Sequence, residues 1–379
     1  MKIALVGFKL SIGNKLFMEI LTNSLRKSGE SVFACGDKNF FEHKDYQGTS
    51  ICSGGNGLRM FFDTLNVMNW ISFYRFLMNH KPDLTYFISS HPLNNIGIIL
   101  IKIFNKINNH KIMVLSHIHD PIPHSDTKYR FFIYLSQLVQ IWLSDKICVF
   151  GKKLGNFLSS HYKVPKENIL YIRHGAYRIS DKTCLYSGYE KSDFIYVSLL
   201  GRIDKYKGVD IFLKAAKRAL DIIDNQKINV VFLIGGEGNL SEYYDLLHEI
   251  PLKNLDIRNY LLSNSEFDEI LKRSYCCVLP YKDASQTGNI QIAYYNACPV
   301  IATNTGSLDE LVVDGETGFI IPVNDIESLA HRIVYFIKNP EQRLSFGARA
   351  LKFYKENLTW ETIISDFILK IERWRALER

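Results

Sequence analysis

Short apolar runs rich in Val, Ile and Phe alternate along the chain with longer segments whose apolar residues recur at helical spacing. In residues 14–28, for example, the apolar positions recur every three or four residues, and Gly29 follows as a helix-ending residue. The apolar runs of the first half predict strands near residues 2–8, 31–35, 84–89, 111–116, 146–150 and 168–172. Strands that alternate with helices are typical of parallel sheets covered on both faces.

A polar stretch, "GAYRISDKTCLYSGYEKSD", interrupts this rhythm, and a second alternating series follows it. The second series predicts strands near 194–200, 229–234, 254–259, 275–280, 299–302 and 318–321, and then helices over 325–338, 340–356 and 359–377. We therefore expect an α/β chain of two Rossmann-like, doubly wound parallel-sheet domains that face each other across a cleft. The expected parts are an N-terminal domain 1–175, a linker 176–193, a C-terminal domain 194–358 and a last helix, 359–379, that returns toward the N-terminal domain.

Composition narrows the class of protein. Of 379 residues, 47% are hydrophobic and 22% charged, as in globular proteins, and the net charge of +7 is too small to indicate nucleic-acid binding by itself. The seven cysteines form no C-x-x-C pair and their number is odd, which favours reduced thiols in the cytoplasm. The longest apolar run, 131–143, is interrupted by Gln137 and Gln140, so we expect no membrane-spanning segment. The N-terminus is predicted to begin the first strand, because its apolar stretch is too short for a signal peptide.

Two stretches of the second half carry candidate chemistry at the predicted carboxyl ends of strands. In "LLGRIDKYKGVDIF", Arg202 and Lys207 lie between a strand and a helix, where a guanidinium fork and an ammonium suit phosphate oxygens. Two solvated cations beside a helix start are an equal alternative. In "LPYKDASQTGNIQIAYYNACPVIATNTG", a small polar loop precedes a helix that should begin near Asn289. The unpaired N–H groups of that helix start would favour an anion, although an ordinary capped helix would look the same.

As a set, these stretches resemble the C-terminal domain of family 4 retaining glycosyltransferases of the GT-B fold (glycosyl transferases group 1). The resemblance rests on G-R-x-x-x-x-K-G after a strand, on P-Y-x-D-x-S-Q-T-G, on "PVIATNTGSLDELVVDGETGFIIP" and on "GGEGN". It covers most of residues 194–330, whereas the first half fits only generally, through "ALVGFKLSIGN" and "SHIHDPIPH".

The resemblance implies roles for individual residues. Arg202 and Lys207 match the pair that binds the donor diphosphate and stabilises it as the leaving group. His119 resembles a cleft histidine near the donor sugar and acceptor, although a hydrogen-bonded loop histidine is nearly as good an interpretation. The histidines of the "HIHDPIPH" loop could also bind a metal. The family needs no metal, however, and we expect neither a metal nor a cofactor. The implied donor-binding residues are Gly13, Asp283, Ser285, Gln286, Thr287, Gly288 and Asn289.

The chain departs from the family pattern at one point. Many relatives have two glutamates eight positions apart, which fall here on Ala284 and Ile292. Asp283 or the Ser285–Gln286 pair could replace the first near the donor sugar. Nothing nearby replaces the second, which normally holds the ribose, since Gln291 should point elsewhere on the helix. The resemblance therefore implies a variant member of this glycosyltransferase family that lacks the usual paired glutamates.

The resulting expectation is a glycosyltransferase that moves a sugar from a nucleotide-diphosphate sugar to a saccharide acceptor, retaining and metal-independent. By analogy, the acceptor would be lipid-linked and the pathway bacterial-type surface polysaccharide biosynthesis. Such a protein would be cytoplasmic, with peripheral contact at the inner face of a membrane and no nucleic-acid partner. The segment 58–81 could lie on that membrane, but a helix packed on the sheet is favoured. Two alternatives stay open: a catalytically silent GT-B relative that acts as a binding partner in a glycosyltransferase complex, and a nucleotide-sugar epimerase of the same fold.

Overall fold

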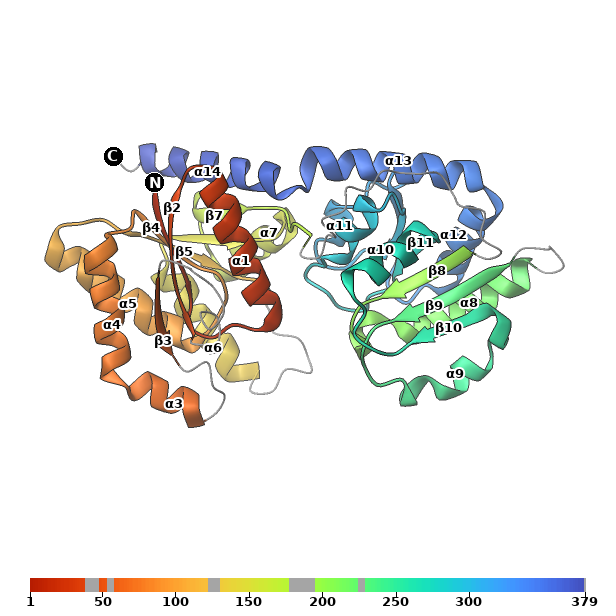
Figure 1. The fold of residues 1–379 in the computed structure, drawn as a ribbon, viewed down its shortest axis with the longest axis horizontal. Helices are drawn as coiled ribbons and strands as arrows, with labels where there is room; N and C mark the ends of the chain where they lie inside the picture. Colours follow the sequence, from red (N-terminus) through yellow and green to blue (C-terminus); the bar gives the residue numbers. More distant parts are fainter. Residues whose placement is uncertain (38–47, 53–57, 122–129, 177–194, 224–228, 378–379) are drawn as a thin grey trace. The chain divides into compact units, whose positions relative to one another are not determined.

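Two parallel sheets organise the chain in the computed structural model, which describes residues 1–37, 48–52, 58–121, 130–176, 195–223 and 229–377. Each sheet belongs to a separate compact unit (Figure 1). The N-terminal unit is Met1–Arg173 together with Trp360–Arg379, and the C-terminal unit is His174–Thr359. The predicted class, two doubly wound α/β domains, is confirmed. Most of the expected linker lies outside the described residues.

The sheet of the N-terminal unit has seven strands in the order β3-β2-β1-β4-β5-β6-β7, all paired in parallel. The strands are β1 Lys2–Gly7, β2 Ser31–Asp37, β3 Gly48–Cys52, β4 Leu84–Phe87, β5 Met113–His117, β6 Lys146–Val149 and β7 Ile169–Tyr171. The helices are α1 Ile12–Lys27, α3 Leu58–Leu65, α4 Val67–His80, α5 Pro92–Asn108, α6 Arg130–Leu143, α7 Lys152–Tyr162 and α14 Trp360–Leu377. Strand β3 escapes the sequence prediction because it is a short edge strand of mixed polarity.

Local chemistry explains two boundaries in this unit. The Ser11 side chain accepts the backbone N–H of Asn14, which caps the start of α1. The segment 58–81, expected as one helix, breaks at Asn66, whose side chain caps α4 by accepting the N–H of Met68. Helix α4 then packs inward through Phe73 and its buried neighbours, as the favoured interpretation required.

Helix α14 completes the N-terminal unit from the far end of the chain. It packs beside α1 (Figure 1). The Phe367 ring stacks on Tyr86 with centroids 5.5 Å apart. Arg375 pairs with Asp83 at 2.9 Å. These contacts tie residues nearly 300 positions apart into one core.

The sheet of the C-terminal unit has six strands in the order β10-β9-β8-β11-β12-β13, again parallel. Its strands are β8 Ile195–Leu200, β9 Val230–Gly235, β10 Leu255–Arg258, β11 Ser274–Leu279, β12 Val300–Thr303 and β13 Gly318–Ile321. Its helices are α8 Val209–Ile223, α9 Tyr244–His248, α10 Asn264–Lys272, α11 Asn289–Tyr295, α12 Ile326–Lys338 and α13 Pro340–Asn357. Short 3-10 turns lie at η1 Lys166–Asn168 in the first unit and at η2 Lys205–Lys207, η3 Ser241–Tyr243, η4 Leu252–Asn254 and η5 Leu308–Glu310 in the second.

Strand β8 shows why these strands are continuously apolar. Val197 and Leu199 point into a core shared with α8 and α12, whereas Tyr196 and Leu200 point into a second core shared with α10, α11 and α13. A strand buried on both faces favours apolar residues at most positions, and the one polar residue of β8, Ser198, accepts a hydrogen bond from the Ser274 hydroxyl at 2.9 Å. Strands β8 and β11 are neighbours, so the residues that follow them meet at one edge of the sheet.

Candidate functional site

The turn between β8 and α8 is shaped by two glycines. Gly201 has φ +108° and Gly208 has φ +72°, both in the region that favours glycine. A Cβ atom at Gly208 would collide with the backbone carbonyl of Pro280, which follows β11. The turn can therefore approach the β11–α11 loop closely, which places η2 beside that loop.

Lys207 lies at this contact as a nearly buried cation. Its side chain donates a hydrogen bond from Nζ to Tyr281 Oη at 3.0 Å, and Nζ lies 4.6 Å from the centre of the Tyr281 ring. The residue is 9% exposed. Burial acts to lower the pKa of Lys207, but the neighbouring Tyr281, Tyr206 and Asp204 outweigh it, so the pKa lies above its ordinary value. Lys207 is therefore a fixed positive charge at neutral pH.

Asn289 reaches the same point from the start of α11. Its Nδ2 donates to the carbonyl of Leu200 at 2.7 Å and to Tyr281 Oη at 3.2 Å. A Cβ atom built on Gly201 would lie 3.1 Å from Asn289 Nδ2 and 3.6 Å from Lys207 Nζ. The structure thus brings together two predicted residues, Lys207 and Asn289, around a third that the prediction missed. Tyr281 could have been found, because it lies two residues after β11, the strand beside the one that ends at the Lys207 turn.

Arg202 takes a different direction from Lys207. Its Nε donates to Asp204 Oδ2 at 2.6 Å, and its side chain is 74% exposed. The hydrogen bond with Asp204 holds the pKa of Arg202 above its ordinary value. The two cations share the predicted turn, but Arg202 is the exposed one.

The loop before α11 has a partly structural role. Asp283 is exposed, Ser285, Gln286 and Gly288 are half-buried, and Thr287 is 7% exposed. The Thr287 hydroxyl accepts the backbone N–H of Asn289 at 3.2 Å, and α11 has seven residues. The N-cap residue Gly288 makes no side-chain cap, but the first N–H of this short helix is already paired with Thr287 and is not free for an anion.

A tight turn after β12 supports this loop. Gly306 has φ +54°, and a Cβ atom there would collide with the carbonyl of Ala284. The backbone N–H of Ser307 donates to the carbonyl of Ser285 at 3.0 Å. The "NTG" turn thus fixes the backbone of the loop.

The two positions where relatives have glutamates are apolar core positions here. Ala284 and Ile292 are each 4% exposed and belong to the core shared by α10, α11 and α13. Gln291 is fully buried and donates from Nε2 to the carbonyl of His174 at 2.7 Å. Its amide therefore anchors the segment that precedes the expected linker.

Two expected site residues belong to the N-terminal unit. Gly13, expected in a loop, instead lies in the first turn of α1, because Ser11 caps the helix earlier than the glycine suggests. Gly13 is exposed, and a Cβ atom there would meet nothing within 4 Å. No steric requirement within the described part of its unit explains this glycine.

His119 follows β5 in a cluster of aromatic rings. Its Nε2 contacts the carbonyl of Ile88 at 2.8 Å, and its ring stacks on His117 with centroids 4.3 Å apart. Burial lowers the pKa of His119, and the hydrogen bond to Ile88 and the charge of Asp120 offset this only in part. The ring is therefore neutral at pH 7. Because Nε2–H must donate to the carbonyl, Nδ1 has the lone pair and can accept a hydroxyl. His124, which crowds the same stretch of sequence, lies outside the described residues.

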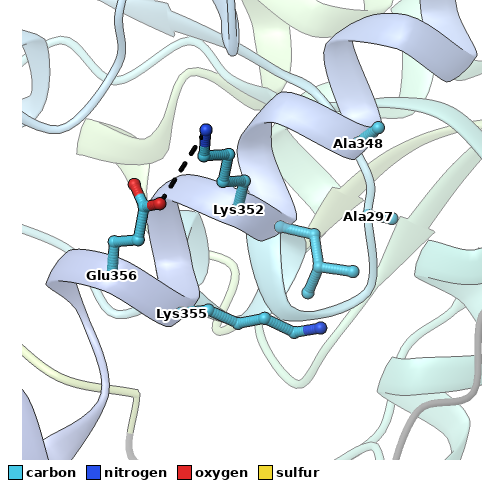
Figure 2. Close-up of a pocket in the computed structure, with 6 residues that line it drawn as sticks. Ala297, Ala348, Lys352, Lys355 and Glu356 are labelled. Carbon is cyan, nitrogen blue, oxygen red and sulfur yellow. Dashed lines mark ion pairs between the residues drawn. The ribbon is translucent and has the colours of Figure 1, made fainter.

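A surface hollow of about 380 Å³ lies elsewhere on the C-terminal unit. Figure 2 shows it along α13, where Lys352 and Glu356 form an ion pair at 3.9 Å. Ala297, on its rim, precedes β12, so the hollow lies at the amino ends of the strands. It is therefore distinct from the Lys207 site. Among the residues that the structure describes, no group of three or more His, Cys, Asp or Glu side chains is placed to hold a metal.

Lys207 and the loop before α11 both lie within the part of the chain that matches a family model. Residues 187–353 match the model of glycosyl transferases group 1. This part of the chain is a group 1 glycosyltransferase domain. The expected resemblance to glycosyl transferases group 1 is thereby confirmed for these residues.

Curated relatives support the group 1 domain. An uncharacterized glycosyltransferase of Methanocaldococcus jannaschii is 29% identical over 58% of this chain and 57% of its own length. A capsular polysaccharide biosynthesis glycosyltransferase of Staphylococcus aureus is 24% identical over 62% of this chain and 65% of its own length. The chain spans about half the length of the first curated relatives it matches. These names support the interpretation of the chain as an enzyme.

Solved structures of two relatives match the fold over almost the whole chain. A sucrose-phosphate synthase from Thermosynechococcus elongatus superposes with a TM-score of 0.73 at 15% identity, and the match covers all of both chains. The Anabaena HepE protein in complex with UDP gives a TM-score of 0.72 at 14% identity, over 98% of this chain and all of the other. At these identities the likeness establishes the GT-B fold and nothing further.

Proposed function

We propose that the group 1 domain works as part of a glycosyltransferase that moves a sugar from a nucleoside-diphosphate sugar to a hydroxyl of a saccharide. The observation that carries the proposal is Lys207, a nearly buried cation fixed at the carboxyl ends of β8 and β11. Parallel α/β sheets bind ligands at these ends. UDP, present in the matched HepE complex, is the first donor nucleotide to test.

The proposed reaction separates charge. Positive charge develops at the anomeric carbon while negative charge collects on the departing diphosphate. Lys207 stabilises that negative charge, and it needs no rearrangement during the reaction because Tyr281 already holds its ammonium group. Arg202 supplies an exposed guanidinium fork next to it, after exchanging its hydrogen bond with Asp204 for one with phosphate. No metal or cofactor is part of the proposal, and the anomeric configuration is retained.

The acceptor class follows from analogy. The capsular polysaccharide enzyme among the relatives supports a saccharide acceptor in surface polysaccharide assembly. A lipid-linked acceptor and peripheral contact with the inner face of a membrane complete the proposal. In the N-terminal unit, neutral His119 offers Nδ1 as an acceptor for a substrate hydroxyl.

One observation favours a second candidate, a silent binding partner. The positions of both family glutamates are apolar and buried, so no carboxylate can contact the donor from there. Binding of a nucleotide without transfer would select this candidate.

Calorimetric titration with UDP, GDP and uridine, followed by transfer assays with the matching nucleotide sugar, tests the proposal. We expect a diphosphate to bind more tightly than its nucleoside, and we expect sugar to reach an oligosaccharide acceptor with release of the diphosphate. Binding without transfer to any saccharide acceptor would support the silent partner instead. Equal affinity for UDP and uridine would contradict the assigned role of Lys207.

A further inference from the structure

Helix α6 has its polarity reversed. Gln137 is 3% exposed and Gln140 is fully buried, whereas Phe131, Phe132 and Trp142 are 70%, 68% and 77% exposed. A surface helix of a globular protein ordinarily turns its apolar stripe inward and its polar residues to water.

The buried glutamines have definite partners. Gln137 Nε2 donates to the carbonyl of Asp120 at 2.8 Å, and Gln140 Nε2 donates to the carbonyl of Ser89 at 3.3 Å. Gln140 Oε1 also accepts the N–H of His91 at 3.4 Å. The amides thus satisfy backbone groups of the loops that follow β4 and β5. The orientation of α6 is therefore specified by hydrogen bonds, and its aromatic residues are left outside as a consequence.

The neighbouring helix continues the exposed apolar surface. Helix α5 packs beside α6 (Figure 1). Asn95 Nδ2 donates to the carbonyl of Ser136 at 3.1 Å. On α5, Ile99, Ile103 and Ile107 are 46%, 45% and 68% exposed, and their spacing of four places them in one row. We call the exposed residues Ile99, Ile103, Ile107, Phe131, Phe132 and Trp142 the apolar face.

The charges on the helices around the apolar face indicate which kind of partner covers it. Helices α4, α5 and α6 contain no acidic residue, and Arg75 on α4 and Lys106 on α5 are exposed. A second copy would bring a second set of cations against the first, whereas an anionic surface would attract them. Exposed Phe and Trp together with Lys and Arg are the composition of helices that lie in the boundary of a bilayer. No helix among those the structure describes is long and apolar enough to cross a membrane.

We propose that the apolar face docks the N-terminal unit on a bilayer that contains anionic phospholipids, with α5 and α6 lying in the interface and Arg75 and Lys106 at the headgroups. The inference deepens the membrane contact of the proposed function. It assigns that contact chiefly to α5 and α6, whereas the sequence pointed to the segment 58–81. It rests on the geometry of α5 and α6 and not on glycosyl transfer. Its test therefore measures lipid binding alone.

Flotation with vesicles of phosphatidylcholine, with and without phosphatidylglycerol, tests the docking. We expect the chain to bind the vesicles that contain phosphatidylglycerol, and less so as salt rises. The double variant F132S/W142S should bind at least tenfold more weakly, because two large apolar side chains no longer enter the boundary. The variant R75E/K106E should bind more weakly and lose most of the salt dependence.

Two further variants serve as controls for the vesicle-binding experiment. L252S/L261S removes two exposed leucines (89% and 67%) from the C-terminal unit and should bind as the unchanged chain does. If F132S/W142S fails to fold, as judged by circular dichroism, vesicle binding is measured instead with I103S/I107S on α5, which should also bind more weakly. Failure of the unchanged chain to bind phosphatidylglycerol vesicles overturns the proposal, as does unaltered binding of the folded variants. A dimer in sedimentation that F132S/W142S dissociates would also overturn it, in favour of a second copy.

Discussion

Replacement of Lys207 by Met is the sharpest perturbation of the candidate site. Methionine keeps the apolar stem of the lysine and removes only the ammonium group. Tyr281 Oη keeps the hydrogen bond from Asn289 Nδ2 at 3.2 Å, so no buried hydroxyl is left without a partner. A typical hydrogen bond contributes about 1 kcal/mol net, and we therefore expect the free energy of unfolding to change by no more than about that amount.

The expected effect on rate is larger. Unit charges 4 Å apart interact by about 4 kcal/mol at an effective dielectric constant of about 20, which sets a ceiling near a thousandfold in rate. Only the part of this interaction that grows between the bound donor and the transition state lowers kcat. Removal of one fixed donor of this kind typically costs on the order of a hundredfold, which is the value we expect for Lys207→Met.

The same 3-10 turn supplies a matched control. Lys205 lies two residues away, is exposed, and pairs outward with Glu242 at 2.8 Å. Lys205→Met removes the same charge from the same turn and should leave kcat within about twofold, in line with the small contribution of exposed ion pairs. Steady-state assays of sugar transfer and calorimetry with UDP would be run on both variants. Equal kcat values for the two variants, with folding intact, would refute the assigned role of Lys207.

Three further changes test other parts of the molecule. Arg202→Lys should lower kcat by about tenfold or more, because an ammonium group cannot reproduce the guanidinium fork. A near-normal kcat would show that Arg202 is only an exposed surface residue. His119→Ala should lower kcat by about tenfold while UDP affinity changes little, since the proposed contact is with the sugar or acceptor; full activity would make the histidine structural. His91 has its pKa lowered to about 4, chiefly by burial and secondly by Lys9. As the pH falls, His91 therefore takes up its proton in the unfolded chain before it does so in the folded chain. The free energy of unfolding should consequently fall by about 3 kcal/mol between pH 6.5 and pH 4. His91→Asn, which keeps a helix-capping side chain, should flatten this dependence in urea unfolding, and an unchanged dependence would contradict the prediction.

Much of the fold could be predicted because buried parallel strands are continuously apolar. The runs that became β8 and β11 are buried on both faces, so a pattern of apolar residues alone marks them. Helix α6 shows the limit of this reasoning. Its inward glutamines donate hydrogen bonds to carbonyls of the loops near Ser89 and Asp120, which are distant in sequence, and no periodicity predicts such partners.

The candidate site could be predicted in position but not in detail. The glycines of the Lys207 turn and the "NTG" turn mark close backbone approaches that the sequence makes visible. Lys207 pairs with Tyr281 and is nearly buried, whereas Arg202 pairs with Asp204 and is exposed, and these partners follow from side-chain geometry that the sequence does not specify. The hydrogen bond from the backbone N–H of Asn289 to the Thr287 hydroxyl likewise depends on the folded geometry of the loop.

The loss of the family glutamates and the retention of Lys207 have different consequences for the proposed reaction. An acid that holds the ribose contacts a part of the donor that does not change during the reaction, so its loss weakens ground-state and transition-state binding alike. A cation at the diphosphate contacts the group whose charge grows, so its retention preserves kcat. If the proposed function holds, Ile292, packed in the core, removes the first kind of contact, and Lys207, fixed against Tyr281, supplies the second. Under that proposal the combination favours a transferase with weak donor affinity, whereas a silent partner that bound nucleotide would need the ribose contact more than the leaving-group cation.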